Sequence, residues 1–181
     1  MKNAIRFAVG AAALVAGNAW AVEADARPLY VKASVGQTEA EVNGFSLSEG
    51  AAYGAALGAA VGPVRVEAGV DRISGDFQTF LEADALDYHA SAFLDLPIGD
   101  KAALFAGAGV DYIDGQANVF GTEIDASGDG YHWAIGGAYR FSENVIGEVQ
   151  FRQVSATLDA DFIGDVDLDA NVVTFGLRMA L

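Results

Sequence analysis

Hydrophobic and polar residues alternate with a period of two along much of this chain, and the pattern is clearest at its C-terminal end. Large apolar residues occupy every second position there: Val173, Phe175, Leu177, Met179 and Leu181. Such a period is typical of a strand with one apolar face and one polar face. The apolar face continues to the last residue, where soluble domains usually fray. This pattern predicts the closing strand of a membrane β-barrel.

Eight segments show this alternation, and the connections between them alternate between short and long. The predicted strands cover residues 29–37, 51–62, 64–73, 85–96, 102–113, 130–142, 145–155 and 168–181. The short connections are 62–63, 97–101 and 142–144, and the long ones are 38–50, 74–84, 114–129 and 156–167. Tight turns at one end and loops at the other are expected of an antiparallel barrel. The pattern therefore predicts an all-β fold, an eight-stranded antiparallel up-and-down transmembrane β-barrel.

The apolar faces of these segments separate a membrane barrel from a soluble periplasmic β-protein. The predicted outward positions carry Val, Leu, Ala, Ile and aromatic residues, with no charge among them. A soluble barrel would need a polar outer face. The membrane alternative is therefore favoured.

Aromatic residues at the strand ends agree with this interpretation. Tyrosines fall at the long-loop ends of four strands, and two further aromatics fall at the opposite end of one of these strands, residues 130–142. The predicted aromatic girdle is Tyr53, Tyr88, Tyr112, Tyr131, Tyr139 and Phe141. Two belts of amphipathic rings are typical of the two interfaces of a bilayer.

The N-terminal residues indicate export from the cytoplasm. Lys2 and Arg6 precede an apolar run from Phe7 to Gly17, and Ala19-Trp20-Ala21 has the small-x-small pattern of a cleavage site. We expect residues 1–21 to be a secretory signal peptide and residues 22–181 to form the barrel domain. The chain contains no cysteine, so no disulfide is available.

In this architecture and in its alternating C-terminal strand, the chain resembles the small outer-membrane β-barrels of the OmpA/OmpX type. The resemblance implies residence in the bacterial outer membrane, among its lipids and lipopolysaccharide, and recognition of the last strand by the barrel-assembly machinery. In that family the last residue is usually aromatic, whereas here it is Leu181. We expect a monomer.

Charged residues on the inward faces predict the contents of the lumen. The predicted lumen charge cluster is Lys32, Arg65, Glu67, Asp87, Asp95, Arg140, Glu148, Arg152 and Arg178. An eight-stranded barrel is just wide enough for side chains to fill it. Because an unpaired buried charge is costly, we interpret these residues as a salt-bridged core. The alternative is an ion path through a narrow channel.

The chain is strongly acidic, with a formal net charge of −15. Its predicted loops carry many of these acids: Glu39, Glu41, Glu49, Asp76, Glu82, Asp84, Asp114, Glu123, Asp125, Asp129, Asp159, Asp161 and Asp165. Such a surface repels nucleic acid and anionic polysaccharide. Divalent cations could bridge these acids to lipopolysaccharide phosphates, although solvated acidic loops are the simpler interpretation.

Two short motifs have the residue types of chemical sites. His89 and Ser91 have the spacing of a base and nucleophile on one strand face, as in outer-membrane lipid hydrolases, but both are expected to face the lumen. Residues 125–130 resemble half of a calcium loop, yet Gly136 stands where the pattern needs Glu. We therefore expect no catalytic residue, no metal and no cofactor. The predicted role is non-enzymatic, in envelope structure or surface contacts. The alternatives are a lipid hydrolase, and a narrow channel or small-ligand carrier.

Overall fold

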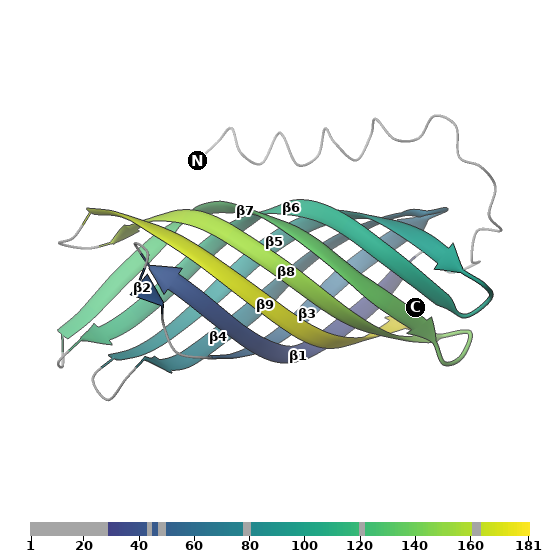
Figure 1. Ribbon diagram of the computed structural model, residues 1–181, viewed down its shortest axis with the longest axis horizontal. Helices are drawn as coiled ribbons and strands as arrows, with labels where there is room; N and C mark the ends of the chain where they lie inside the picture. Colours follow the sequence, from purple (N-terminus) through teal and green to yellow (C-terminus); the bar gives the residue numbers. More distant parts are fainter. Residues whose placement is uncertain (1–28, 43–44, 47–49, 78–80, 120–121, 161–163) are drawn as a thin grey trace.

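The computed structural model describes residues 29–42, 45–46, 50–77, 81–119, 122–160 and 164–181, and all of its elements are strands (Figure 1). Their bounds are β1 Leu29–Val42, β2 Phe45–Ser46, β3 Gly50–Val61, β4 Val64–Phe77, β5 Leu81–Ile98, β6 Ala102–Val119, β7 Thr122–Arg140, β8 Val145–Ala160 and β9 Gly164–Ala180. None of the described residues forms a helix long and apolar enough to cross a membrane. The predicted signal peptide, residues 1–21, lies outside the described residues.

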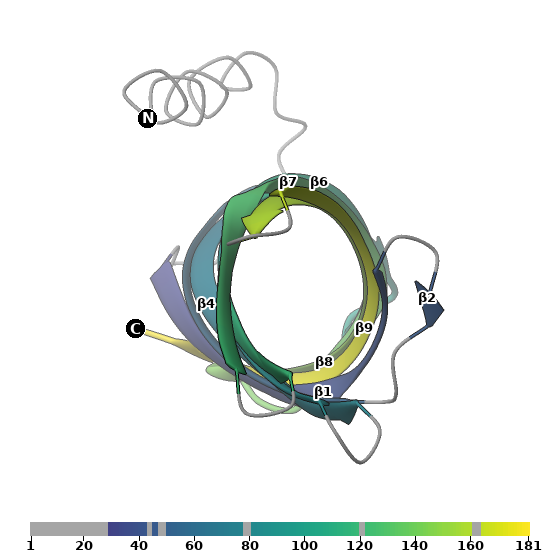
Figure 2. The same cartoon turned by 90° about the vertical axis from the view of Figure 1, so that its left-hand side faces the viewer.

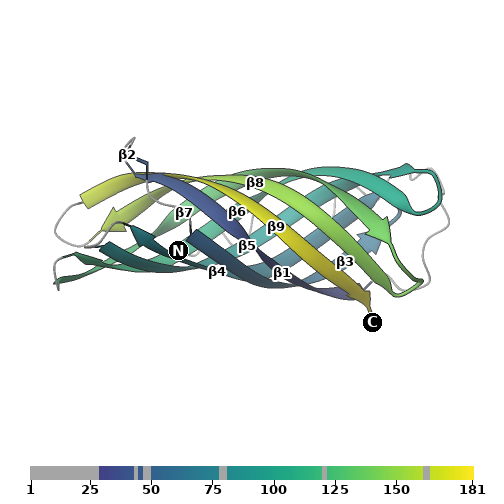
Figure 3. The ribbon, with the colours of Figure 1, turned by 60° about the horizontal axis from the view of Figure 1, so that its bottom comes forward.

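Eight of these strands close into a barrel, as the alternating pattern predicts. Each strand pairs antiparallel with its neighbour in chain order, and β1 also pairs with β9. This last ladder runs from Tyr30 opposite Ala180 to Val42 opposite Leu168. Figure 2 shows the closed ring from one end, and Figure 3 shows β9 between β8 and β1. The short β2 pairs with the end of β1 and takes no part in closure.

The outer face of the barrel carries an apolar band. Exposed large apolar side chains follow one face of each strand; Leu57 of β3, Val110 of β6 and Leu177 of β9 are 63%, 55% and 46% exposed. On β6 the band ends at Tyr112, eleven residues from the start of the strand at Ala102. That length matches the roughly 9–11 residues with which a tilted strand crosses a bilayer.

The predicted long connections are wrong over most of their length, because the strands continue through them. β5 begins at Leu81 rather than near residue 85, and β7 begins at Thr122 rather than near residue 130. Continued pairing satisfies the backbone hydrogen-bonding groups that a loop would leave to water. We call the strand segments beyond the four loop-end tyrosines the collar: residues 38–42, 50–52, 73–77, 81–87, 113–119, 122–130, 154–160 and 164–171. At the other end of the barrel, which we call the turn end, Gly62 and Gly99 adopt positive φ in tight turns.

The two faces of the sheet exchange polarity where the collar begins, and β9 shows this most clearly. Asp165, Asp167 and Asp169 are exposed, whereas Val166 and Ala170, on the other face of the strand, are buried. Beyond Val172 the pattern reverses, so that apolar residues face outward and Arg178 faces the lumen. The collar thus has the polar outside and apolar inside of a soluble barrel. The rest of the barrel has the opposite arrangement, apolar outside and polar inside, which is that of a membrane barrel.

This exchange of polarity predicts that an arginine is tolerated on the outer face of the collar but not on the outer face of the apolar band. Leu57 lies midway between Tyr53 and the turn end on β3, and we expect Leu57→Arg to lower the free energy of unfolding by about 2–4 kcal/mol because the charge faces lipid. Thr157→Arg, on the exposed face of the collar, should change it by less than about 0.5 kcal/mol. Urea unfolding in lipid vesicles measures both. Equal losses would place the collar inside the bilayer.

Candidate functional site: an ion-paired lumen

Charged side chains from β1, β4, β8 and β9 meet inside the barrel towards the turn end. Lys32 Nζ lies 2.7 Å from Glu67 Oε2 and 3.0 Å from Glu148 Oε1. Arg65 forms an ion pair with Glu67, and Arg178 Nε lies 2.9 Å from Glu148 Oε2. These residues, together with Asp95 (3.3 Å from Arg65 Nε), form what we call the turn-side cluster. Each buried charge in it therefore has an opposite partner, as burial requires.

Aromatic rings close the lumen around this cluster. The Arg65 guanidinium carbon lies 4.2 Å from the ring centre of Phe93 and 4.9 Å from that of Phe105. The two phenyl rings meet edge to face at 5.7 Å, and Tyr30 donates a 2.7 Å hydrogen bond to Glu67 Oε1. Cations stack favourably on aromatic faces, more so when water is excluded. Arg65 is completely buried as a result.

A second cluster lies closer to the collar and contains more acid than base. Arg152 Nη2 donates to Asp71 Oδ2 at 2.6 Å and to Asp87 Oδ2 at 2.8 Å, and Arg152 Nη1 lies 3.8 Å from Asp111 Oδ1. Asp111 also pairs with His132 Nδ1 at 2.8 Å. We call these five residues the collar-side cluster. One guanidinium thus joins carboxylates from three strands, a geometry suited to its planar fork of donors.

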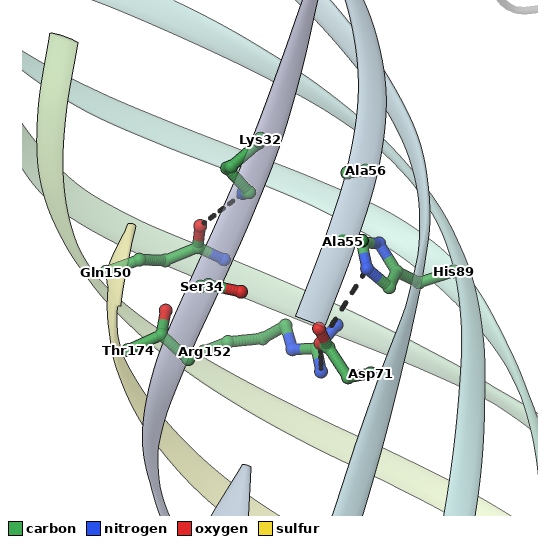
Figure 4. Close-up of a pocket in the computed structure, with 9 residues that line it drawn as sticks. All are labelled: Lys32, Ser34, Ala55, Ala56, Asp71, His89, Gln150, Arg152 and Thr174. Atoms are coloured by element: carbon green, nitrogen blue, oxygen red, sulfur yellow. Dashed lines mark hydrogen bonds and ion pairs between the residues drawn. The ribbon is translucent and has the colours of Figure 1, made fainter. Parts of the chain in front are cut away.

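The space between the two clusters is nearly filled. Figure 4 shows Lys32 directed towards Gln150, and Arg152 and His89 directed towards Asp71. The cavity that these side chains line has a volume of about 10 Å³, which is about the minimum that holds one water molecule. At this level the lumen has no room for a hydrated ion.

Glycines provide the room for the largest inward side chains. Gly58 lies beside the Tyr30 ring, Gly107 beside Phe93 and Gly109 beside His132, each on a neighbouring strand. A Cβ atom at any of these glycines would overlap the neighbouring ring. Each of these large side chains therefore lies opposite a glycine on the neighbouring strand, as close packing of a narrow interior requires.

Ser91 contacts a histidine directly, and through it an aspartate, in an enclosed position. Its hydroxyl lies 2.9 Å from His132 Nε2, and His132 is bonded in turn to Asp111. His89 Nδ1, the base expected from the two-residue spacing, lies farther away at 3.5 Å. Ser91, His132 and Asp111 are all less than 10% exposed and face the lumen. The arrangement resembles a hydrolase triad in connectivity, while burial separates the hydroxyl from lipid.

The predicted lumen charges all lie inside the barrel except Arg140. Arg140 is exposed because β7 ends there, at the open turn end, so the prediction that it belongs to the buried cluster is wrong. The predicted cluster also omits Asp71 and Asp111, both of which contact Arg152. Tyr30 was missed altogether, although it stands two residues before Lys32 and therefore on the same face.

The predicted girdle residues are all exposed on the outer face. The Tyr88 and Tyr112 rings are 6.5 Å apart near the collar, and the Tyr139 and Phe141 rings are 5.4 Å apart at the turn end. Within the described residues, no group of three or more His, Asp or Glu side chains could hold a metal ion.

Comparison with known proteins agrees with this architecture. The model of the outer membrane protein beta-barrel domain family matches residues 7–179. The chain belongs to this family. Its members reside in the bacterial outer membrane, so the apolar band faces lipid and the collar projects from it. No curated protein shows a significant sequence match to the chain.

Solved outer-membrane barrels share the fold at low sequence identity. Neisserial surface protein A superposes with a TM-score of 0.74 at 16% identity, covering 84% of this chain and 97% of that one. OprG of Pseudomonas aeruginosa gives a TM-score of 0.55 at 9% identity, covering 86% and 97%. The attachment invasion locus protein Ail of Yersinia pestis gives 0.53 at 13% identity, covering 84% and 99%. At such identities the likeness shows the fold alone.

The collar-side cluster predicts a large difference between two arginines that both pair with aspartate. Arg152→Met leaves three buried carboxylates without their shared cation, and we expect it to cost about 3–5 kcal/mol of unfolding free energy. Arg72→Met breaks the exposed pair with Asp84 and should cost about 0–1 kcal/mol. Urea unfolding in vesicles compares the two. Similar losses would mean that the lumen charges are solvated.

Proposed function

We propose that this outer-membrane barrel is a sealed, non-enzymatic protein that acts in envelope structure or in surface contacts through its acidic collar. The observation that carries the proposal is the filling of the lumen by two ion-paired clusters. Eight strands leave an interior only as wide as side chains, and these side chains are paired with one another rather than arranged along a water-filled path. The salt-bridged lumen therefore supports a plug and disfavours a channel.

The burial of Ser91 argues against a lipid hydrolase. The hydroxyl faces the lumen beneath the collar, and the residues above it include the buried pair of Arg152 and Asp87. An ester would have to displace these charges to reach the serine. A nucleophile needs access and a position for its substrate as well as a base. The hydrogen bond to His132 is thus better explained as satisfaction of a buried polar group.

The outer surface of the collar is the part of the protein best placed to meet other molecules. Its exposed acids come from six strands: Glu39, Glu41, Asp84, Asp114, Asp125, Asp129, Asp159, Asp165, Asp167 and Asp169. The predicted loop acids Glu49 and Asp161 lie outside the described residues, as do the side chains of Asp76, Glu82 and Glu123. A surface of one sign attracts cationic partners and repels polyanions.

Ail provides a contrast on this point. One of its structures is of a complex with the heparin analogue sucrose octasulfate. We propose that the present chain does not share such a ligand, since its collar would repel sulfates, and that it does not bind nucleic acid. Its proposed partners are outer-membrane lipids and lipopolysaccharide around the apolar band, and the barrel-assembly machinery at β9. We propose that it is a monomer.

A sealed lumen predicts that the protein does not conduct ions across a bilayer. Purified protein, shown to be folded by its shift in gel mobility on boiling, should give no stepwise currents in a planar bilayer. A porin-type barrel added afterwards to the same bilayer should conduct, which shows that the membrane accepts channels. Reproducible unit currents from the protein alone would contradict the proposal and favour the narrow channel.

The acidic collar predicts selective retention on charged surfaces. In nanodiscs at low salt the protein should bind polylysine beads and pass over heparin beads, and both differences should fade at high salt because the charges are screened. Replacing Asp165, Asp167 and Asp169 by Asn should weaken retention on polylysine.

The matched control removes acids at the turn end, where Lys101 and Arg140 offset them. Asp100→Asn with Glu143→Gln should therefore reduce retention on polylysine much less than the collar variant does. Retention of the unmodified protein on heparin, or equal effects of the two variants, would argue against a role for the collar charges.

A further inference from the structure

The interior of the collar contains a cavity of about 280 Å³. The collar is the end of the barrel that faces the viewer in Figure 2. Its walls are almost entirely apolar and come from strands all round the ring; they include Ile73, Ile113, Val154, Leu158, Val166 and Leu168. A mostly apolar, largely preformed hollow with few polar groups is the usual form of a small-molecule site.

This cavity is unusual in its position. The collar stands beyond the apolar band, so water rather than lipid surrounds it, and its outer face is acidic. Val154, Ala156, Ala170 and Ile113 pack into a buried core on one part of the wall.

The floor of the cavity carries two polar atoms without a hydrogen-bond partner. Thr38 Oγ1 and Asp87 Oδ1 both belong to side chains that line the cavity, and these residues are 3% and 1% exposed. Leaving a buried polar group unpaired costs about 1–3 kcal/mol. Both atoms can accept a hydrogen bond. They are therefore suited to a ligand whose polar end donates one.

Together, the apolar walls, the two acceptors on the floor and the acidic exterior define the ligand. We propose that the collar binds a small amphiphile with a hydrocarbon tail and a hydrogen-bond-donating head group that carries no negative charge, such as a medium-chain alcohol. The head lies on Thr38 and Asp87, and the tail lies against the apolar walls. An anionic head is excluded because it would approach Asp87 and the collar acids.

The volume limits the length of the tail. An apolar cavity of about 150 Å³ binds benzene, so a cavity of about 280 Å³ has room for about ten carbon atoms. Closing the floor is the collar-side cluster, in which Arg152 holds Asp71 and Asp87. The site is thus a pocket with a closed floor, and it requires no passage through the lumen.

A pair of probes with equal tails tests this inference. 1-Decanol and decanoate would be titrated into the full protein in nanodiscs, with the methyl groups of Ile and Val observed by NMR. Decanol should shift the signals of Ile113 and Val154 to saturation, whereas lipid-facing Ile135 and Val110 should change only in proportion to the probe dissolved in the bilayer. Decanoate should give no saturable shift at Ile113.

Two variants locate the binding. Thr38→Val keeps the shape of the side chain and removes its hydroxyl, and it should weaken decanol binding about three- to tenfold. Ala126→Phe places a ring in the cavity and should abolish the saturable shift. Ala108→Phe, on the lipid-facing side of β6, is the control and should leave it unchanged. Gel mobility before and after boiling shows that each variant is folded.

The inference is overturned if decanol gives no saturable shift at Ile113 and Val154, or if decanoate binds as well as decanol. It is also overturned if Ala126→Phe, although folded, binds decanol as the unmodified protein does. These results do not depend on bilayer conductance or on retention by charged beads. A failure here therefore leaves the sealed-barrel proposal to its own tests.

Discussion

The narrow interior of an eight-stranded barrel is the constraint on which the rest of this structure depends. Closure between β1 and β9 satisfies the backbone, as lipid demands. It also directs every second side chain into an interior that is just wide enough for side chains to fill. Charges placed there cannot be hydrated, so each must find an opposite charge or a hydrogen bond. The two clusters joined by Arg65 and Arg152 are the consequence, and so are the glycines that make space for them.

The same strands pass through two different surroundings along their length. In the bilayer they face lipid outside and ion pairs inside, whereas in the collar they face water outside and hydrocarbon side chains inside. The tyrosines mark the level at which one arrangement gives way to the other. A strand such as β9 can serve both because its hydrogen bonds run unchanged through the exchange, and only the side chains alter.

Much of the membrane part could be predicted from the sequence because lipid imposes a strict alternation. The outward residues of β6 and β9, the inward charges such as Lys32 and Glu148, and the closing pair of strands follow directly from a period of two. Arg140 obeys that period and is nevertheless exposed, since alternation gives the face of a residue but not its distance from the end of the barrel. Which acid meets Arg152 depends on three strands at once, and no local pattern encodes it.

The collar differs from its prediction for another reason. The pattern predicts acidic loops in its place because the apolar outer face ends at the tyrosines. The run from Asp165 to Ala170 alternates as regularly as the membrane strands, with the opposite phase. The adjacent pair Val172 and Val173 marks the point where the phase changes. A search that accepts alternation with apolar residues on either face, and that continues across such an adjacent apolar pair, predicts the longer strands.

The fit between glycines and rings also bears on how the strands find their alignment during assembly. A slip of one residue between two strands would turn apolar side chains inward, but a slip of two would leave both faces with their proper polarity. The lipid-facing residues, being similar in kind, could not distinguish the second error. The lumen could: on β5 and β6 such a slip brings Phe93 opposite Phe105 instead of Gly107. The side chains inside the lumen therefore specify the register between neighbouring strands, which the lipid-facing side chains do not.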